Sequence, residues 1–173
     1  MADEITLRNG LEVSFSSVRA EDEPAIVEFL TDLSAESSRR RFFSVAIDLR
    51  KETHRELTGA VADHYGLLAR IPGLGIVGHA IYARSPLATR AEVAVEVADD
   101  LHHFGLATQL VIRLAQHAED RQITQFFAEV LPENRDMLAV FCDAFSTTSV
   151  AGPDAIEVEF STAGWRAAQA LFQ

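Results

Sequence analysis

Hydrophobic and polar residues alternate in two short runs near the start of the chain, and Asn9-Gly10 stands between them within residues 5–15. Asn-Gly between two alternating runs is a strong short-range signal for a β-hairpin with a type I′ turn. Acidic residues and Pro24 then lead into apolar residues at helical spacing, which indicates the start of a helix. The apolar positions of this predicted helix are Ile26, Phe29, Leu30 and Leu33.

The middle of the chain changes from helical to strand-like patterning. Residues 36–57 are rich in charge and favour short helical pieces, whereas apolar runs at 65–71, 75–83 and 92–98 favour strands. Residues 105–119 form the clearest predicted helix, because their apolar residues fall on one stripe. That stripe consists of Leu106, Leu110, Leu114 and Ala118.

The last third of the chain alternates between the two periodicities. The expected elements are a buried strand at 124–131, a helix at 134–145, a loop at 146–154, a strand at 156–160 and a short helix at 162–172. The order of all these elements predicts an α/β (α+β) fold, a mixed sheet with helices packed on its faces. No repeat or linker interrupts the order, so we expect residues 1–173 to form a single domain.

Composition narrows the class of protein. The 173 residues carry a formal net charge of −11 and are 48% hydrophobic, which is ordinary globular composition. The acidity argues against binding to nucleic acids or anionic membranes and is compatible with cationic partners such as amines. No apolar run approaches the roughly 20 residues of a membrane span, and the N-terminus lacks a hydrophobic signal core, so we expect a cytoplasmic protein.

The cysteine and the histidines of the sequence do not indicate a metal site. Cys142 is alone, which excludes an intrachain disulfide and a cysteine-based zinc site, and its place beside Phe141 predicts a small core residue. The histidines show no metal-ligand spacing with one another or with acids, so no metal site is expected.

The most informative stretch runs from Val95 to Thr108, where a predicted strand ends, a loop turns and a helix begins at Gly105. Unpaired backbone N–H groups at a helix N-terminus, together with the positive end of the helix dipole, bind anions. Gly105 and Ala107 keep side chains away from such a site. The pattern also suits an ordinary strand-to-helix turn in which Gly105 only relieves backbone strain.

This stretch resembles the acetyl-coenzyme A signature of GNAT acetyltransferases, a strand followed by Gln/Arg-x-x-Gly-x-Gly/Ala. Gly105 and Ala107 match the signature, and His102 stands where Gln or Arg is usual. His103 and Phe104 occupy positions where related sequences often have a small and a basic residue. The segments TLRNGLEVSFSSVRAEDE and LSAESSRRRFF are similar to the acetyltransferase domain of bacterial protein-lysine acetyltransferases.

The resemblance implies a GNAT fold with a mostly antiparallel central sheet and helices on both faces. It also implies acetyl-coenzyme A as cosubstrate and an amine, such as a protein lysine, as acceptor. The backbone of Val95, Glu96 and Val97 would pair with pantetheine, and Asn134 would help to hold the pantetheine arm. The expected pyrophosphate site comprises His102 and the amides of His103, Phe104, Gly105, Leu106, Ala107 and Thr108.

Two acids share one face of the predicted central strand. Glu92 and Glu96 follow the two-residue alternation, but their Cα atoms lie roughly 13 Å apart, so they cannot serve the same atom. Burial would raise the pKa of either acid and make it a better base, whereas exposure to solvent or pairing with an arginine would leave it a structural residue. Ala91-Glu92-Val93 matches the context of the general base in the lysine-acetyltransferase subgroup, so the resemblance makes Glu92 the candidate base.

Other positions are less specific. Phe141 stands where many GNAT enzymes have a tyrosine that protonates the leaving thiolate, and its place on an apolar stripe predicts core packing instead. Arg39-Arg40-Arg41 suits either a contact with the 3′-phosphate of coenzyme A or a solvated helix face. The leading hypothesis is an N-acetyltransferase, and the alternative is a non-catalytic GNAT-like module that binds coenzyme A. The acceptor and the oligomeric state stay open.

Overall fold

The computed structural model describes residues 3–34, 63–85 and 87–171. The predicted helical pieces at 36–57, with Arg39-Arg40-Arg41, lie outside these residues. The strands are β1 (Asp3–Thr6), β2 (Glu12–Ser17), β3 (His64–Ile71), β4 (Gly75–Arg84), β5 (Arg90–Val97), β6 (Gln125–Val130), β7 (Thr147–Ala151) and β8 (Ile156–Ser161). The helices are α1 (Glu23–Asp32), α4 (Leu106–Glu119), α5 (Arg135–Ala144) and α6 (Trp165–Ala170), with short 3₁₀ turns at Ala20–Asp22, Asp99–Leu101 and Thr162–Gly164.

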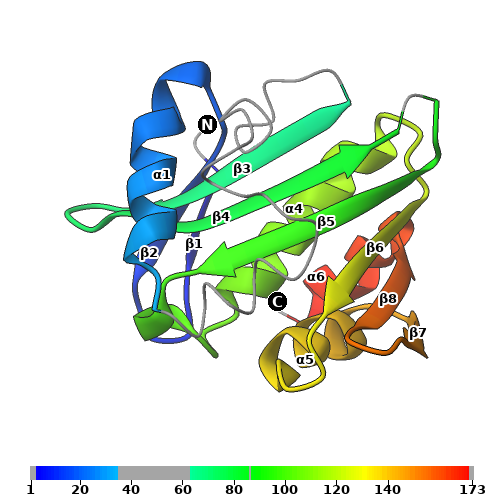
Figure 1. The fold of residues 1–173 in the computed structure, drawn as a ribbon. Helices are drawn as coiled ribbons and strands as arrows, with labels where there is room; N and C mark the ends of the chain where they lie inside the picture. Colours follow the sequence, from blue (N-terminus) through cyan, green and yellow to red (C-terminus); the bar gives the residue numbers. More distant parts are fainter. Residues whose placement is uncertain (1–2, 35–62, 86, 172–173) are drawn as a thin grey trace.

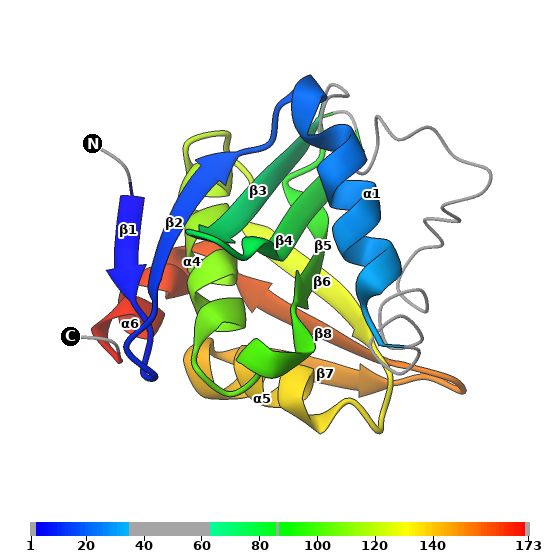
Figure 2. The ribbon, with the colours of Figure 1, turned by 90° about the vertical axis from the view of Figure 1, so that its left-hand side faces the viewer.

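The strands form one sheet in the order β1-β2-β3-β4-β5-β6-β8-β7. Only the pair β5–β6 is parallel among these neighbours, and all the others are antiparallel. Helix α1 packs on one face and helix α4 on the other, as Figures 1 and 2 show. The expectation of a mixed, mostly antiparallel sheet with helices on both faces is therefore confirmed.

Two apolar clusters hold the helices to the sheet. On one face, Leu110 and Leu114 of α4 pack with strand residues in the larger cluster, and Gly78 of β4 leaves room for the Leu110 side chain. On the other face, Ile26 and Leu30 of α1 pack against Leu68 of β3. Burial of each side chain of this kind stabilises the fold by about 2 kcal/mol. The helical spacing of these side chains therefore decides which face of each helix packs on the sheet.

The N-terminal hairpin forms as predicted, but its turn is of another type. Among residues 8–10 only Gly10 has a positive φ, 86°, whereas a type I′ turn needs positive φ at both central residues. The amide of Gly10 donates to the carbonyl of Leu7 at 2.9 Å, and the amide of Leu7 donates to the carbonyl of Leu11 at 2.8 Å. These bonds define a type I turn over Leu7–Gly10 followed by a bulge at Gly10.

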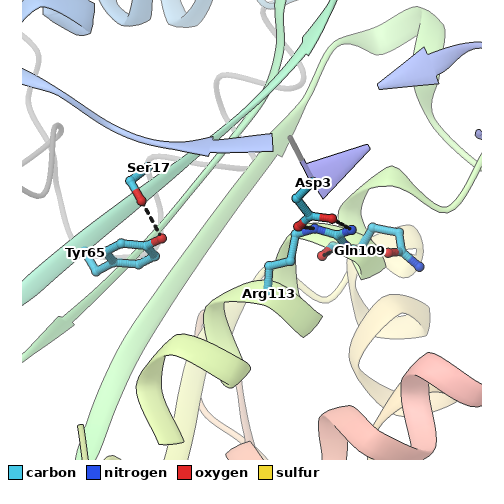
Figure 3. A network of polar contacts seen from close by, with 5 residues as sticks. All are labelled: Asp3, Ser17, Tyr65, Gln109 and Arg113. Carbon is cyan, nitrogen blue, oxygen red and sulfur yellow. Dashed lines mark hydrogen bonds and ion pairs between the residues drawn. The ribbon is translucent and has the colours of Figure 1, made fainter. Parts of the chain in front are cut away.

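A side-chain network ties strand β1 to helix α4. The guanidinium of Arg113 binds the carboxylate of Asp3 through two nitrogens, with 2.7 Å between Nη2 and Oδ1, and it also contacts Gln109 (Figure 3). Nearby, the hydroxyls of Ser17 and Tyr65 lie 2.9 Å apart and join β2 to β3. The network holds the N-terminal hairpin against the helix that carries the predicted anion site.

Two further local predictions are wrong. The expected loop at 146–154 contains strand β7, an edge strand whose residues are mostly exposed, so its Ser and Thr content concealed its pairing with β8. Cys142 is exposed rather than part of the core, since the buried side of α5 carries Phe141 and Ala144.

Candidate functional site

The site begins where two parallel strands separate. Strand β5 pairs with β4 from Ala91 to Val97, but it pairs with β6 only from Arg90 to Glu92. Past the register pair Glu92–Phe127 the two strands diverge toward their carboxyl ends, as their arrows do in Figure 1. A cavity of about 440 Å³ lies here, lined by Val93 to Val97 on one side and Ala128 to Val130 on the other. We call this cavity the cleft.

Backbone groups of β5 border the cleft. The amide of Ala98 donates to the carbonyl of Val77 at 2.9 Å, so even-numbered residues at this end direct their backbone groups toward β4. Because these groups alternate between the two edges of a strand, those of Val93, Val95 and Val97 point toward β6. Since β6 has diverged at this point, the amide of Val95 is available to a ligand in the cleft.

The loop of the predicted pyrophosphate site, residues 102–108, lines the cleft except at Phe104. We call it the phosphate loop. Gly105 is the N-cap of α4 with a φ of 88°, and His103 has a φ of 67°, so both residues adopt the left-handed conformation. Gly105 thus has a backbone role whether or not an anion binds. The Nε2 atom of His102 donates to the carbonyl of Val97 at 3.2 Å, while His103 is exposed, with Nδ1 3.9 Å from a carboxylate oxygen of Asp136.

The structure brings the predicted cofactor residues together. All of them line the cleft except Phe104, whose side chain packs against the larger apolar cluster. Asn134 caps α5, because its Oδ1 accepts from the amide of Met137 at 3.3 Å, and this use leaves the side-chain NH₂ to donate elsewhere. Asn134 therefore lines the same cavity as the end of β5, the loop and the start of α4, although it lies far from them in sequence.

Glu92 stands at the apex where β5 and β6 separate. It does not line the cleft itself, but the next residues, Val93 and Ala94, do. Its carboxylate is half-buried, and burial, together with the nearby acids Glu129 and Glu157, raises its pKa from 4.5 to about 7. A carboxyl group with this pKa is part ionised at neutral pH, which suits a general base.

Glu96 has different surroundings on the same face of β5. Its side chain is buried, and its Oε2 lies 2.9 Å from Nδ1 of His79, which is itself 0% exposed. The expectation that Glu96 is exposed to solvent is wrong, because its side chain is buried. His79 lies in the part of β4 that is buried on both faces of the sheet, residues 77–82, but only the β4–β5 register puts it opposite Glu96.

Residues 27–143 match the Acetyltransferase (GNAT) family. The chain belongs to this family. Among solved structures, the GNAT domain of S. lividans PAT is 30% identical, with 92% of this chain and 96% of that chain covered and a TM-score of 0.77.

Two further GNAT-fold structures are more distant and support the fold alone. A cAMP-binding acyltransferase from Mycobacterium smegmatis is 23% identical, with 98% of this chain but 54% of that chain covered and a TM-score of 0.64. Spermidine N-acetyltransferase from Vibrio cholerae, in complex with CoA and spermine, is 10% identical, with 89% and 98% covered and a TM-score of 0.68.

Phe141 is buried in this GNAT domain, and its ring centroid lies 5.1 Å from that of Phe160. The predicted core role of Phe141 is therefore confirmed, and this position offers no proton to a leaving thiolate. In the described ranges no three His, Cys, Asp or Glu side chains gather as a possible metal site, and no helix is long and apolar enough to cross a membrane.

Sequence reasoning missed several residues that line the GNAT cleft. Arg8 comes from the turn of the N-terminal hairpin, and Asp136 and Asp143 come from α5. No local pattern marks these residues, since each reaches the cleft through contacts between distant segments.

Proposed function

We propose that this GNAT domain is an N-acetyltransferase that moves the acetyl group of acetyl-coenzyme A to an amine. The observation that carries the proposal is the half-buried carboxylate of Glu92, with a pKa raised to about 7, at the apex of a cleft next to a helix N-terminus. Transfer from a phosphate-containing thioester to an amine requires an anion site and a nearby base, and here the base stands beside the cavity that holds the anion site.

The residues of the cleft fit coenzyme A. The amides of Gly105, Leu106 and Ala107 at the start of α4 would hold the pyrophosphate. The backbone of Val95 and Val97, directed toward the cleft, would pair with the pantetheine arm, and Asn134 would donate to it through its amide group.

The chemistry follows from these positions. Glu92 takes a proton from the ammonium form of the acceptor, because only the neutral amine has the lone pair that attacks the thioester carbonyl. The amide of Val95 donates to the carbonyl oxygen as negative charge develops on it. The new C–N bond forms as the C–S bond breaks, and the thiolate takes a proton from solvent, since Phe141 cannot supply one.

The acceptor that we propose is a lysine side chain of a protein. The resemblance of the opening segments to bacterial protein-lysine acetyltransferases supports this choice, as does the 30% identity with the GNAT domain of S. lividans PAT. The acids Glu129 and Glu157 beside Glu92 favour a cationic amine over an anionic acceptor.

We further propose a bacterial, cytoplasmic protein that acts as a single domain and binds neither nucleic acid nor membrane, in keeping with its net charge of −11.

One observation favours a second function, a non-catalytic module that binds coenzyme A. The loop carries His102, His103 and Phe104 where the family signature has a strong donor and a basic residue, and the position of the usual tyrosine is Phe141. These replacements weaken the anion site and remove a proton donor.

Two measurements on the same protein separate the functions. Calorimetry with acetyl-coenzyme A reports binding, and thiol release with a panel of lysine peptides and small amines reports transfer. Binding with amine-dependent thiol release supports the enzyme, and binding without release on every acceptor favours the module. Absence of binding would contradict both.

A further inference from the structure

Arg8 reaches the cleft from an element far from the phosphate loop in sequence. It occupies the second position of the type I turn Leu7–Gly10, its side chain is exposed to solvent, and it lines the cleft. Both views show the β1–β2 turn beside the loop that leads into α4 (Figures 1 and 2). Arg8 is thus placed at the outer rim of the anion site.

The turn is held in this place by contacts on both sides of Arg8. Leu7 is buried in the same apolar cluster as Leu106, the first residue of α4. The pairing of Asp3 with Arg113 clamps β1 to the second turn of α4 (Figure 3). The position of the Arg8 backbone therefore depends on the folded core.

The charge of the cleft calls for such a residue. Among the arginines in the described ranges, Arg8 alone lines the cleft, whose other charged side chains there are the acids Glu96, Glu129, Asp136 and Asp143. Phe104 contributes no charge where the family signature often has a basic residue. Among the described arginines, an anion in the cleft therefore meets only the permanent charge of Arg8, in a protein of net charge −11.

We propose that Arg8 binds the 3′-phosphate of coenzyme A, an inference that rests on the proposed binding of coenzyme A in the cleft. The amides at the start of α4 serve the pyrophosphate, which leaves the terminal phosphate for a group outside the loop. A terminal phosphate presents several oxygens to the planar fork of a guanidinium, which can bind two of them at once. Arg8 supplies the charge that the loop lacks, from another part of the fold.

The test compares coenzyme A with 3′-dephospho-coenzyme A in the wild type and in Arg8→Gln. We expect the wild type to bind coenzyme A about tenfold more tightly than the dephospho form, as for a solvent-exposed hydrogen bond to a charged group. Arg8→Gln should lose this preference while its Kd for dephospho-coenzyme A stays unchanged. Arg8→Lys should keep part of it, since a lysine retains the charge without the fork.

Arg19→Gln is the matched control. Arg19 follows β2, whose other end carries the hairpin turn, so this variant removes the same charge far from the cleft and should keep the preference. Equal weakening of both ligands by Arg8→Gln would assign Arg8 to the pyrophosphate and overturn the proposal, as would no change in either Kd. Loss of the preference in Arg39→Gln/Arg40→Gln/Arg41→Gln but not in Arg8→Gln would assign the 3′-phosphate to that run. A wild type that binds neither ligand would instead refute the proposed function.

Discussion

The two ends of β5 carry the same residue type on the same face of the sheet and put it to different uses. Glu92 lies where β6 is still paired, and its charged neighbours are the acids Glu129 and Glu157. Glu96 lies where β6 has diverged, and its carboxylate meets the buried imidazole of His79 from β4. Burial alone does not make a base, because the partner that is buried with the carboxylate decides whether its charge is opposed or stabilised.

The largest expected effect is on kcat and tests the proposed role of Glu92 in this comparison. Glu92→Gln removes the proposed base and should lower kcat by about 10²-fold or more, as loss of a general base does, with little change in the Kd for coenzyme A. Steady-state kinetics with an accepted amine measure the first quantity and calorimetry the second. Glu96→Gln is the matched control and should lower kcat much less. Equal kcat for the wild type and Glu92→Gln would remove Glu92 from the mechanism.

The next effect concerns stability at the other end of the strand. Glu96→Ala leaves the fully buried side chain of His79 without the carboxylate at 2.9 Å. Removal of one partner from a buried pair costs about 3 kcal/mol, and denaturant unfolding measures this loss. Glu96→Gln, which keeps a hydrogen-bonding group at this position, should lose less stability than Glu96→Ala. A Glu96→Ala variant as stable as the wild type would show that the pair contributes nothing to the fold.

A smaller effect tests the proposed anion site at the start of α4, which follows the Glu96 end of β5. Ala107→Glu places a negative charge in the first turn of α4 without disturbing the left-handed Gly105. The Kd for acetyl-coenzyme A should rise at least about tenfold, roughly 1.4 kcal/mol. Ala25→Glu, on the exposed side of α1, changes the net charge equally and should leave the Kd unaltered. If both variants bind like the wild type, the phosphates lie elsewhere.

The smallest effect is the dependence of stability on pH. The pKa of Glu92 is about 7 in the fold and 4.5 as its ordinary value, so the folded protein binds the extra proton between these values and loses stability as pH rises through about 7. Glu92→Gln should match the wild type at about pH 4.5 and exceed its stability by about 1 kcal/mol above pH 7, after allowance for solvent screening of a half-buried group. Thermal unfolding at several pH values measures the difference. A constant difference across this range would mean that Glu92 has an ordinary pKa.

Much of the fold could be predicted because its signals are local. The stripe of Leu106, Leu110 and Leu114 identifies α4, and the Asn9-Gly10 signal identifies the hairpin. The turn type was wrong because Asn9 does not adopt a positive φ, and β7 was missed because an exposed edge strand needs no apolar face. Local sequence thus indicates where an element lies more reliably than how its ends are closed.

The candidate site was predictable to the same extent. The loop around Gly105 and the two acids of β5 follow from spacing and from the family resemblance. His79 and Arg8 could not be found this way, since the first depends on the register of β4 against β5 and the second on the packing of a hairpin against α4.

The sequence by itself determined that a strand with two acids on one face runs into a glycine-containing helix start, because periodicity and backbone freedom act over a few residues. Only the tertiary structure decided that β6 pairs with β5 as far as Glu92 and then diverges to form the cleft. It also decided that Glu96 meets a histidine while Glu92 meets other acids. Strand register and the pairing of distant segments are set by the simultaneous burial of many side chains, and no single segment carries that information.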